Sequence, residues 1–152
     1  LLAELIKQGR LKPSSGLEGK VTFHDPCYLG RYNDTYEEPR EIVRALPGTE
    51  LVEMQQNRER SFCCGAGGGL MWVEVESDKR VNNKRAEHAL ESGSDIVSVA
   101  CPFCMTMLDD GIKSKKGERD VKVLDIAELL DRADNARARL TGESTLARGG
   151  EL

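Results

Sequence analysis

Residues 95–104, DIVSVACPFC, join a short apolar segment to a proline that suits the first turn of a helix. The segment 95–100 is rich in β-branched residues, as is typical of a parallel strand that is covered on both faces. Pro102 suits the first helical position, because the N–H group that it lacks would have no helical partner there. The sequence therefore predicts a buried strand that leads into a helix through Cys101.

The same alternation of strand and helix continues on both sides of this stretch. Further strands are predicted at 21–24, 50–54 and 121–124, and helices at 39–46, about 78–90, from Pro102 and from residue 126. Asp125 with Glu128 forms a capping-box-like start of the last helix. Helix-length crossovers between strands predict an α/β fold: an open, mainly parallel sheet of about four strands with helices on both faces, Rossmann-like in its three layers.

Composition and charge exclude several classes of protein. The chain has 152 residues, 39% of them hydrophobic and 32% charged, which is typical of a globular domain with its own core. The net charge of −4 argues against a nucleic-acid partner, because phosphate binding requires a basic surface. No apolar run approaches the roughly 18 residues of a membrane span, and the start of the chain lacks a signal-peptide pattern.

Three parts are expected along the chain. It begins at Leu1 inside a helix-like segment, so residues 1–19 are interpreted as a helix and linker from a longer protein. Residues 20–140 are expected to form the compact domain, and the polar residues 141–152 a disordered tail. The odd number of cysteines, five, favours metal or redox chemistry in the cytoplasm over a secreted disulfide framework.

The cysteines share one position relative to the predicted strands. Cys27 follows the first strand, Cys63 and Cys64 lie in the loop after the second, Cys101 ends the third, and Cys104 lies one turn into the next helix. The carboxyl ends of parallel strands form the edge at which open α/β sheets bind ligands. We therefore expect all five sulfur atoms to converge on one pocket.

The loop at 61–70, SFCCGAGGGL, places two adjacent cysteines before a run of glycines. Gly65 and Gly67 are predicted to help bind a cofactor, because a chain without Cβ atoms turns sharply and brings its amides close to a ligand. A dinucleotide fingerprint is the rival interpretation. It would require glycine or alanine at position 70, where the sequence has Leu70, so nucleotide binding is disfavoured.

The number of cysteines bears on the kind of metal site. A helix N-terminus lowers the pKa of a thiol, so CPFC at 101–104 favours the thiolate form that ligates metals. A zinc ion or a cubane [4Fe–4S] cluster takes four ligands, and five cysteines exceed that number. Adjacent cysteines favour a multi-iron cluster, in which neighbours bind different irons. Structural zinc and a metal-free thiol–disulfide pair at CPFC are the alternatives.

Three motifs carry a resemblance to a known family: HDPC at 24–27, CCG at 63–65 and CPFC at 101–104. Together they resemble the cysteine-rich CCG domain found in heterodisulfide reductases and in glycolate oxidase iron–sulfur proteins. The resemblance covers about residues 20–130, and the flanking residues look most like the C-terminal domain of larger iron–sulfur oxidoreductases.

The resemblance implies a cofactor, a function and partners. The cofactor is a [4Fe–4S] cluster of unusual type, absent from material handled in air, with zinc as the alternative. It would be held by Cys27, Cys63, Cys64, Cys101 and Cys104. The function is electron transfer within an oxidoreductase, between a flavoprotein or ferredoxin-type centre and a quinone or disulfide, with no separate catalytic acid or base. The implied location is cytoplasmic, or the cytoplasmic side of a membrane-bound complex.

Other polar and aromatic residues carry weaker signals. His24 is interpreted either as a hydrogen-bonding or proton-supplying group near the cofactor or as a strand-end histidine satisfied by backbone. His88 is expected on the surface and Trp72 in packing. Arg31 and Arg58 are interpreted as solvated charges, with contact to an anionic substrate or partner as the alternative.

Overall fold

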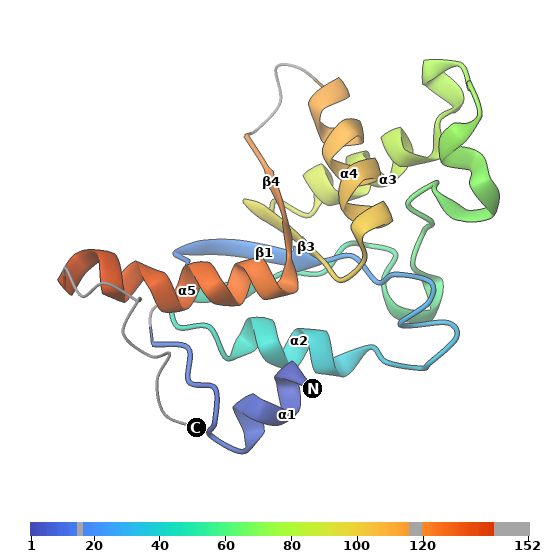
Figure 1. The fold of residues 1–152 in the computed structure, drawn as a ribbon. Coiled ribbons are helices and arrows are strands. Elements are labelled where there is room, and N and C mark those ends of the chain that lie inside the picture. Colours follow the sequence, from blue (N-terminus) through green and yellow to red (C-terminus); the bar gives the residue numbers. More distant parts are fainter. Residues whose placement is uncertain (15–16, 116–119, 142–152) are drawn as a thin grey trace.

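The computed structural model describes residues 1–14, 17–115 and 120–141, which form one sheet and the helices around it (Figure 1). The strands are β1 (Gly19–Phe23), β2 (Thr49–Leu51), β3 (Ile96–Val99) and β4 (Lys122–Asp125). The α-helices are α1 (Leu2–Lys7), α2 (Glu37–Arg44), α3 (Val81–Glu91), α4 (Pro102–Ser114) and α5 (Ile126–Thr141). Short 3-10 turns occupy Arg58–Arg60, Gly67–Trp72 and Ser77–Lys79. The predicted tail, 141–152, lies outside the described residues except for Thr141, which ends α5.

The sheet is four-stranded and parallel throughout, in the order β2-β1-β3-β4. Val21 of β1 pairs with Leu51 of β2 on one side and with Ile96 of β3 on the other. The strand order reverses direction between β1 and β3, and the crevice beyond such a reversal is the usual ligand site of open α/β sheets. The predicted α/β fold class is confirmed. The strand order also indicates where a ligand would bind, namely at the carboxyl ends of β1 and β3.

Helices cover both faces of the sheet and make the fold three-layered (Figure 1). On one face, α1, α2 and α5 pack their apolar side chains against β1, with Phe23, Val43 and Leu129 in the centre of that core. On the other face, α3 and α4 pack against β3, around Val97 and Leu108.

The two helices of the second face approach each other closely at Gly111. A Cβ atom at Gly111 would lie only 2.7 Å from the carbonyl oxygen of Asn82, so the contact requires glycine. None of the helices in the described ranges combines the length and apolar character that a bilayer span needs.

Local signals account for the helix starts nearest the site. Pro102 occupies the first position of α4, as predicted, and Cys101 is the N-cap. At α5, Asp125 Oδ1 accepts a hydrogen bond from the Ala127 amide (2.8 Å), and Glu128 Oε2 accepts one from the Asp125 amide (3.0 Å). These two bonds confirm the predicted capping box.

Candidate metal centre

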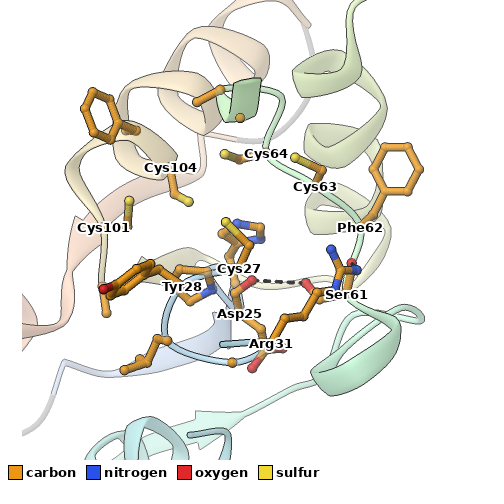
Figure 2. Close-up of a pocket in the computed structure, with 18 of the residues that line it drawn as sticks. Asp25, Cys27, Tyr28, Arg31, Ser61, Phe62, Cys63, Cys64, Cys101 and Cys104 are labelled. Atoms are coloured by element: carbon orange, nitrogen blue, oxygen red, sulfur yellow. Dashed lines mark hydrogen bonds between the residues drawn. The ribbon is translucent and has the colours of Figure 1, made fainter. Parts of the chain in front are cut away.

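A pocket of about 600 Å³ opens at the carboxyl edge of the sheet, and all five cysteines line it. Figure 2 shows their side chains arranged around a common space, although they come from three separate segments of the chain. Cys27 follows β1 and Cys101 follows β3, so these two flank the reversal of the strand order. The convergence expected from the strand assignments is therefore present in the fold.

Two of the five cysteines are buried and the others are accessible. Cys64 and Cys104 are buried in the core of the second face, whereas Cys27 and Cys63 are exposed and Cys101 is intermediate. One ring nitrogen of His24, Cys64 Sγ and Cys104 Sγ all lie within 4.8 Å of one another. The deep end of the pocket thus holds two sulfurs and an imidazole, and its mouth holds the remaining sulfurs.

The glycine loop brings backbone amides to the sulfur atoms. The Gly65 amide donates a hydrogen bond to Cys63 Sγ at 3.3 Å. Gly65 has a φ of +93°, and a Cβ atom there would lie 3.1 Å from the Asn82 amide nitrogen, so this turn requires glycine. Gly65 itself does not line the pocket, whereas Gly67 does.

Crowding of the thiols disfavours their ionisation. The pKa of Cys64 is raised to about 11, chiefly by the thiol of Cys104 and also by burial. The pKa of Cys63 is raised further, chiefly by the thiol of Cys64 and then by burial. Each additional thiolate would add negative charge to the same small space, so a bound cation is what would favour several thiolates at once.

His24 lies between the sulfurs and a buried arginine. Nδ1 of His24 accepts a hydrogen bond from Arg85 Nε at 3.0 Å. Arg85 also donates to the Gln56 carbonyl oxygen (2.8 Å) and to Ser61 Oγ (3.3 Å). The pKa of His24 is held well below its usual value by burial first and by Arg85 second, so the imidazole is neutral.

Asp25, the next residue, points to a different partner. Its carboxylate accepts hydrogen bonds from both terminal nitrogens of Arg40 at 2.7 and 3.0 Å, and from the Arg58 amide at 2.8 Å. Its carbonyl oxygen accepts a bond from Ser61 Oγ at 3.3 Å, the dashed line in Figure 2. These bonds tie the loop that bears Cys27 to the loop that leads to Cys63.

Exposed aromatic side chains surround the mouth of the pocket. Tyr28, Trp72 and Phe103 line it and are 73%, 81% and 55% exposed. Arg31 and Arg58 also line it, and Arg31 Nη2 donates to the Ser61 carbonyl oxygen at 2.5 Å. Arg31 is exposed and Arg58 is half-buried, and both also form hydrogen bonds within the chain.

The structure corrects two expectations and adds residues that the sequence did not reveal. Trp72 is exposed rather than packed, and His88 is buried against Phe62 rather than on the surface. Arg85 and Arg40 carried no sequence signal, because each is one charged residue in a helix that bears several.

Comparison with known proteins gives the relatives of this chain. The sequence model of the family described as "Cysteine-rich domain" (CCG) matches residues 21–109, more than half of the chain. The chain is 54% identical over 130 residues to the "Probable iron-sulfur-binding oxidoreductase FadF" of Bacillus subtilis, covering 86% of this chain and 18% of that protein.

Two further relatives belong to redox systems by their names. The "EtfAB:quinone oxidoreductase" of Syntrophomonas wolfei is 42% identical over 140 residues, 88% of this chain and 20% of that protein. One component of the "Dihydromethanophenazine:CoB--CoM heterodisulfide reductase" of Methanosarcina acetivorans is 39% identical over 132 residues, 87% of this chain and 32% of that protein. The chain thus spans between about a fifth and a third of the length of these relatives. By its matched residues and its cysteine motifs, the chain belongs to the CCG cysteine-rich domain family.

Proposed function

We propose that the chain is an electron-transfer domain that binds an iron–sulfur centre in the cysteine pocket. The observation that carries the proposal is the convergence of five free cysteines on one pocket at the reversal of the strand order. The name of the Bacillus subtilis relative, an iron–sulfur-binding oxidoreductase, supports iron over other metals, and the heterodisulfide reductase relative supports a redox role.

The residues present fit such a group. Its ligands would be Cys27, Cys63, Cys64, Cys101 and Cys104. The donor set is all sulfur, as iron–sulfur clusters require, and it exceeds the four ligands of a zinc ion. When bound, the cluster, proposed to be of the unusual [4Fe–4S] type, would supply one-electron redox chemistry.

The protein's own residues would ligate, bond to and shield the centre. The Gly65 amide already donates to Cys63 Sγ, and such bonds tune the potential of a cluster. The burial of Cys64 and Cys104 shields their side of the pocket, whereas Cys27 and Cys63 leave the other side open to exchange of electrons. No acid or base chemistry is needed in this role.

The exposed aromatic rim is proposed to receive the redox partner. Tyr28, Trp72 and Phe103 present apolar area beside the exposed cysteines, where a docked protein would come close to the centre. We propose that the donor is a flavoprotein or a ferredoxin-type centre, with electron-transfer flavoprotein favoured by the name of one relative. A quinone or a disulfide would be the acceptor, on the cytoplasmic side of a larger complex.

Iron and acid-labile sulfide analysis of the anaerobically purified chain, with EPR before and after reduction, tests the function. We expect iron and sulfide in similar amounts and a reducible signal, lost on exposure to air. Cys64→Ser and Cys104→Ser should abolish both. Ser94→Ala, a buried substitution in the turn before β3, is the matched control and should retain them.

The same measurement separates the alternatives. One tightly bound zinc, with no sulfide and no visible chromophore, would show that the site is a structural zinc site and not an iron–sulfur cluster. Thiol–disulfide exchange that survives chelation and depends only on Cys101 and Cys104 would show that these two cysteines act as a metal-free redox pair.

A further inference from the structure

We propose that Arg85 and His24 form a positioning pair that holds a buried positive charge and a fixed N–H donor against the metal centre and raises its reduction potential. The proposal deepens the function above and rests on it. Its starting point is a buried charge that forms no direct ion pair with a carboxylate of the described residues, since the nearby Asp25 carboxylate is bonded to Arg40.

Arg85 is a fully buried cation whose hydrogen-bond partners are all neutral. Its side chain is 0% exposed and bonds to an imidazole nitrogen, a carbonyl oxygen and a hydroxyl. Burial lowers the pKa of Arg85, and the Asp25 carboxylate raises it through space. That carboxylate is bonded to Arg40, so the cost of burying the Arg85 cation is only partly offset within the chain. The cost is physically reasonable if a ligand supplies the missing negative charge, and a thiolate-bound cluster beside Cys64 and Cys104 is such a ligand.

The bond from Arg85 also determines the protonation of His24. The Nε–H of arginine can only donate, so His24 Nδ1 must accept and carries no proton. We assign the Nε2–H tautomer to His24 from this hydrogen bond. Because His24 lines the pocket and Nδ1 is occupied, Nε2–H is the group available to a ligand there.

This tautomer makes His24 a donor and not a ligand. A ligating Nε2 must be unprotonated, with the proton on Nδ1 given to an acceptor, and Arg85 is no acceptor. The proximity of His24 to Cys64 and Cys104 therefore fits a hydrogen bond from Nε2–H to a sulfur of the centre.

Both parts of the pair act in the same direction. Reduction adds negative charge to the centre, and a nearby cation and an N–H donor stabilise the more negative state. Hydrogen bonds and local charge are established ways in which a protein sets the potential of a cluster. The pair should therefore raise the potential relative to a chain that lacks it.

Spectroelectrochemical titration of the anaerobically purified, iron-loaded chain tests the pair. Arg85→Gln and His24→Phe should each lower the equilibrium constant for one-electron reduction of the centre at least tenfold. This corresponds to a fall in reduction potential of at least about 59 mV. Arg85→Lys keeps the charge and should shift less. His24→Gln should rescue most of the loss, because its amide can accept from Arg85 and donate to sulfur. The double variant Arg85→Gln/His24→Phe should shift by less than the sum of the single variants.

The control is Lys84→Gln, one residue away on α3. Lys84 is exposed and paired with Glu87, so the same loss of charge should leave the potential unchanged. Full iron loading with unshifted potentials in Arg85→Gln and His24→Phe would overturn the pairing alone. A wild-type chain without iron and sulfide would overturn the proposed function and the pairing together. If Arg85→Gln loses iron, the potentials of His24→Phe and His24→Gln test the pair instead. A lowered potential in His24→Phe that His24→Gln restores would support it, and equal potentials would overturn it.

Discussion

Among the residues that the structure describes, two arginines are fully buried, and their surroundings are opposite. Arg40 of α2 bonds to two carboxylates: its nitrogens lie 2.7 and 3.0 Å from Asp25 and 2.7 and 3.0 Å from Glu53. Arg85 of α3 bonds only to neutral groups. Burial acts to lower the pKa of both, but the carboxylates raise that of Arg40 above its usual value, whereas that of Arg85 falls to about 10.

The difference begins at two neighbouring residues at the end of β1. Successive side chains on an extended chain point to opposite faces, so His24 bonds to Arg85 on the face covered by α3, and Asp25 bonds to Arg40 on the face covered by α2. A charge that serves the fold has its counter-ions within the chain. A charge that is bonded to no counter-ion points to a ligand, and the motif HDPC thus serves both faces.

The largest expected loss in the free energy of unfolding comes from replacing Arg40, the arginine that is bonded to carboxylates. Arg40→Met leaves the buried Asp25 carboxylate without its ion-pair partner, whereas Glu53 keeps Arg58 at 3.4 Å, and breaking a buried pair in this way costs about 3–5 kcal/mol. Urea unfolding followed by circular dichroism would measure the loss. Lys113→Met, at an exposed pair with Asp109, is the control and should change the free energy of unfolding by less than about 0.5 kcal/mol. A loss below about 1 kcal/mol for Arg40→Met would contradict the structural role.

The next effect concerns the pH dependence that His24 gives the metal-free chain. Its folded pKa is lowered well below the unfolded value of about 6.5, by burial and then by Arg85. The unfolded state therefore binds the proton first as the pH falls. The stabilisation is fully present above about pH 6.5 and is lost below it, with a slope of about 1.4 kcal/mol per pH unit.

His24→Gln removes this dependence, because glutamine does not titrate. Urea midpoints between pH 7 and pH 5 would then fall less steeply than those of the wild type. Burial also lowers the pKa of His88, so His88 contributes to the pH dependence with the same sign. The variant His88→Gln measures how much of the pH dependence is due to His88. Equal slopes in the wild type and His24→Gln would show that His24 is not buried as the structure has it.

A smaller change in the free energy of unfolding is expected from replacing Arg85, the arginine that is bonded only to neutral groups. Arg85→Met in the metal-free chain removes the desolvation cost of a buried cation but leaves His24 Nδ1 and the Gln56 carbonyl oxygen without a donor. These effects have opposite signs, so we expect a change within about 1 kcal/mol by the same urea measurement. A loss as large as that of Arg40→Met would mean that Arg85 serves the fold.

The fold was readable from the sequence because its signals are local. The β-branched strand before Pro102 and the capping box at Asp125 each depend on a few neighbouring residues, and the structure has both. The expected strand 50–54 is shorter, Thr49–Leu51, because the chain then leaves the sheet and buries Met54 in the core of the second face.

The cysteine pocket was also predictable, since parallel strands bring their carboxyl ends to one edge. The ligand set itself stays a prediction. The residues behind the sulfurs were not predictable, because α3 buries polar side chains such as Asn82, Arg85 and His88, and no apolar stripe marks its inner face. In the structure, the burial of Ala86 and Ala89 and the close contact of Asn82 with Gly111 of α4 show which side of α3 is inside.

The smallest expected effect is at the exposed ion pair beside the buried one. Glu37, 51% exposed, accepts hydrogen bonds from Arg58, which lower its pKa. The pair therefore stabilises the fold above the unfolded pKa of glutamate, about 4.3, and that contribution is lost as the pH falls through the lowered folded value.

Because solvent screens this pair, Glu37→Gln should cost at most about 0.5 kcal/mol at pH 7, and the cost should disappear in 1 M salt. The conformation of Arg58, which has a φ of +53°, is fixed instead by its backbone amide, which bonds to Asp25 Oδ2 at 2.8 Å. Urea midpoints at low and high salt would measure the difference. A larger, salt-independent loss would show that Glu37 belongs to the buried network of Arg40, and that this network extends to the edge of the pocket.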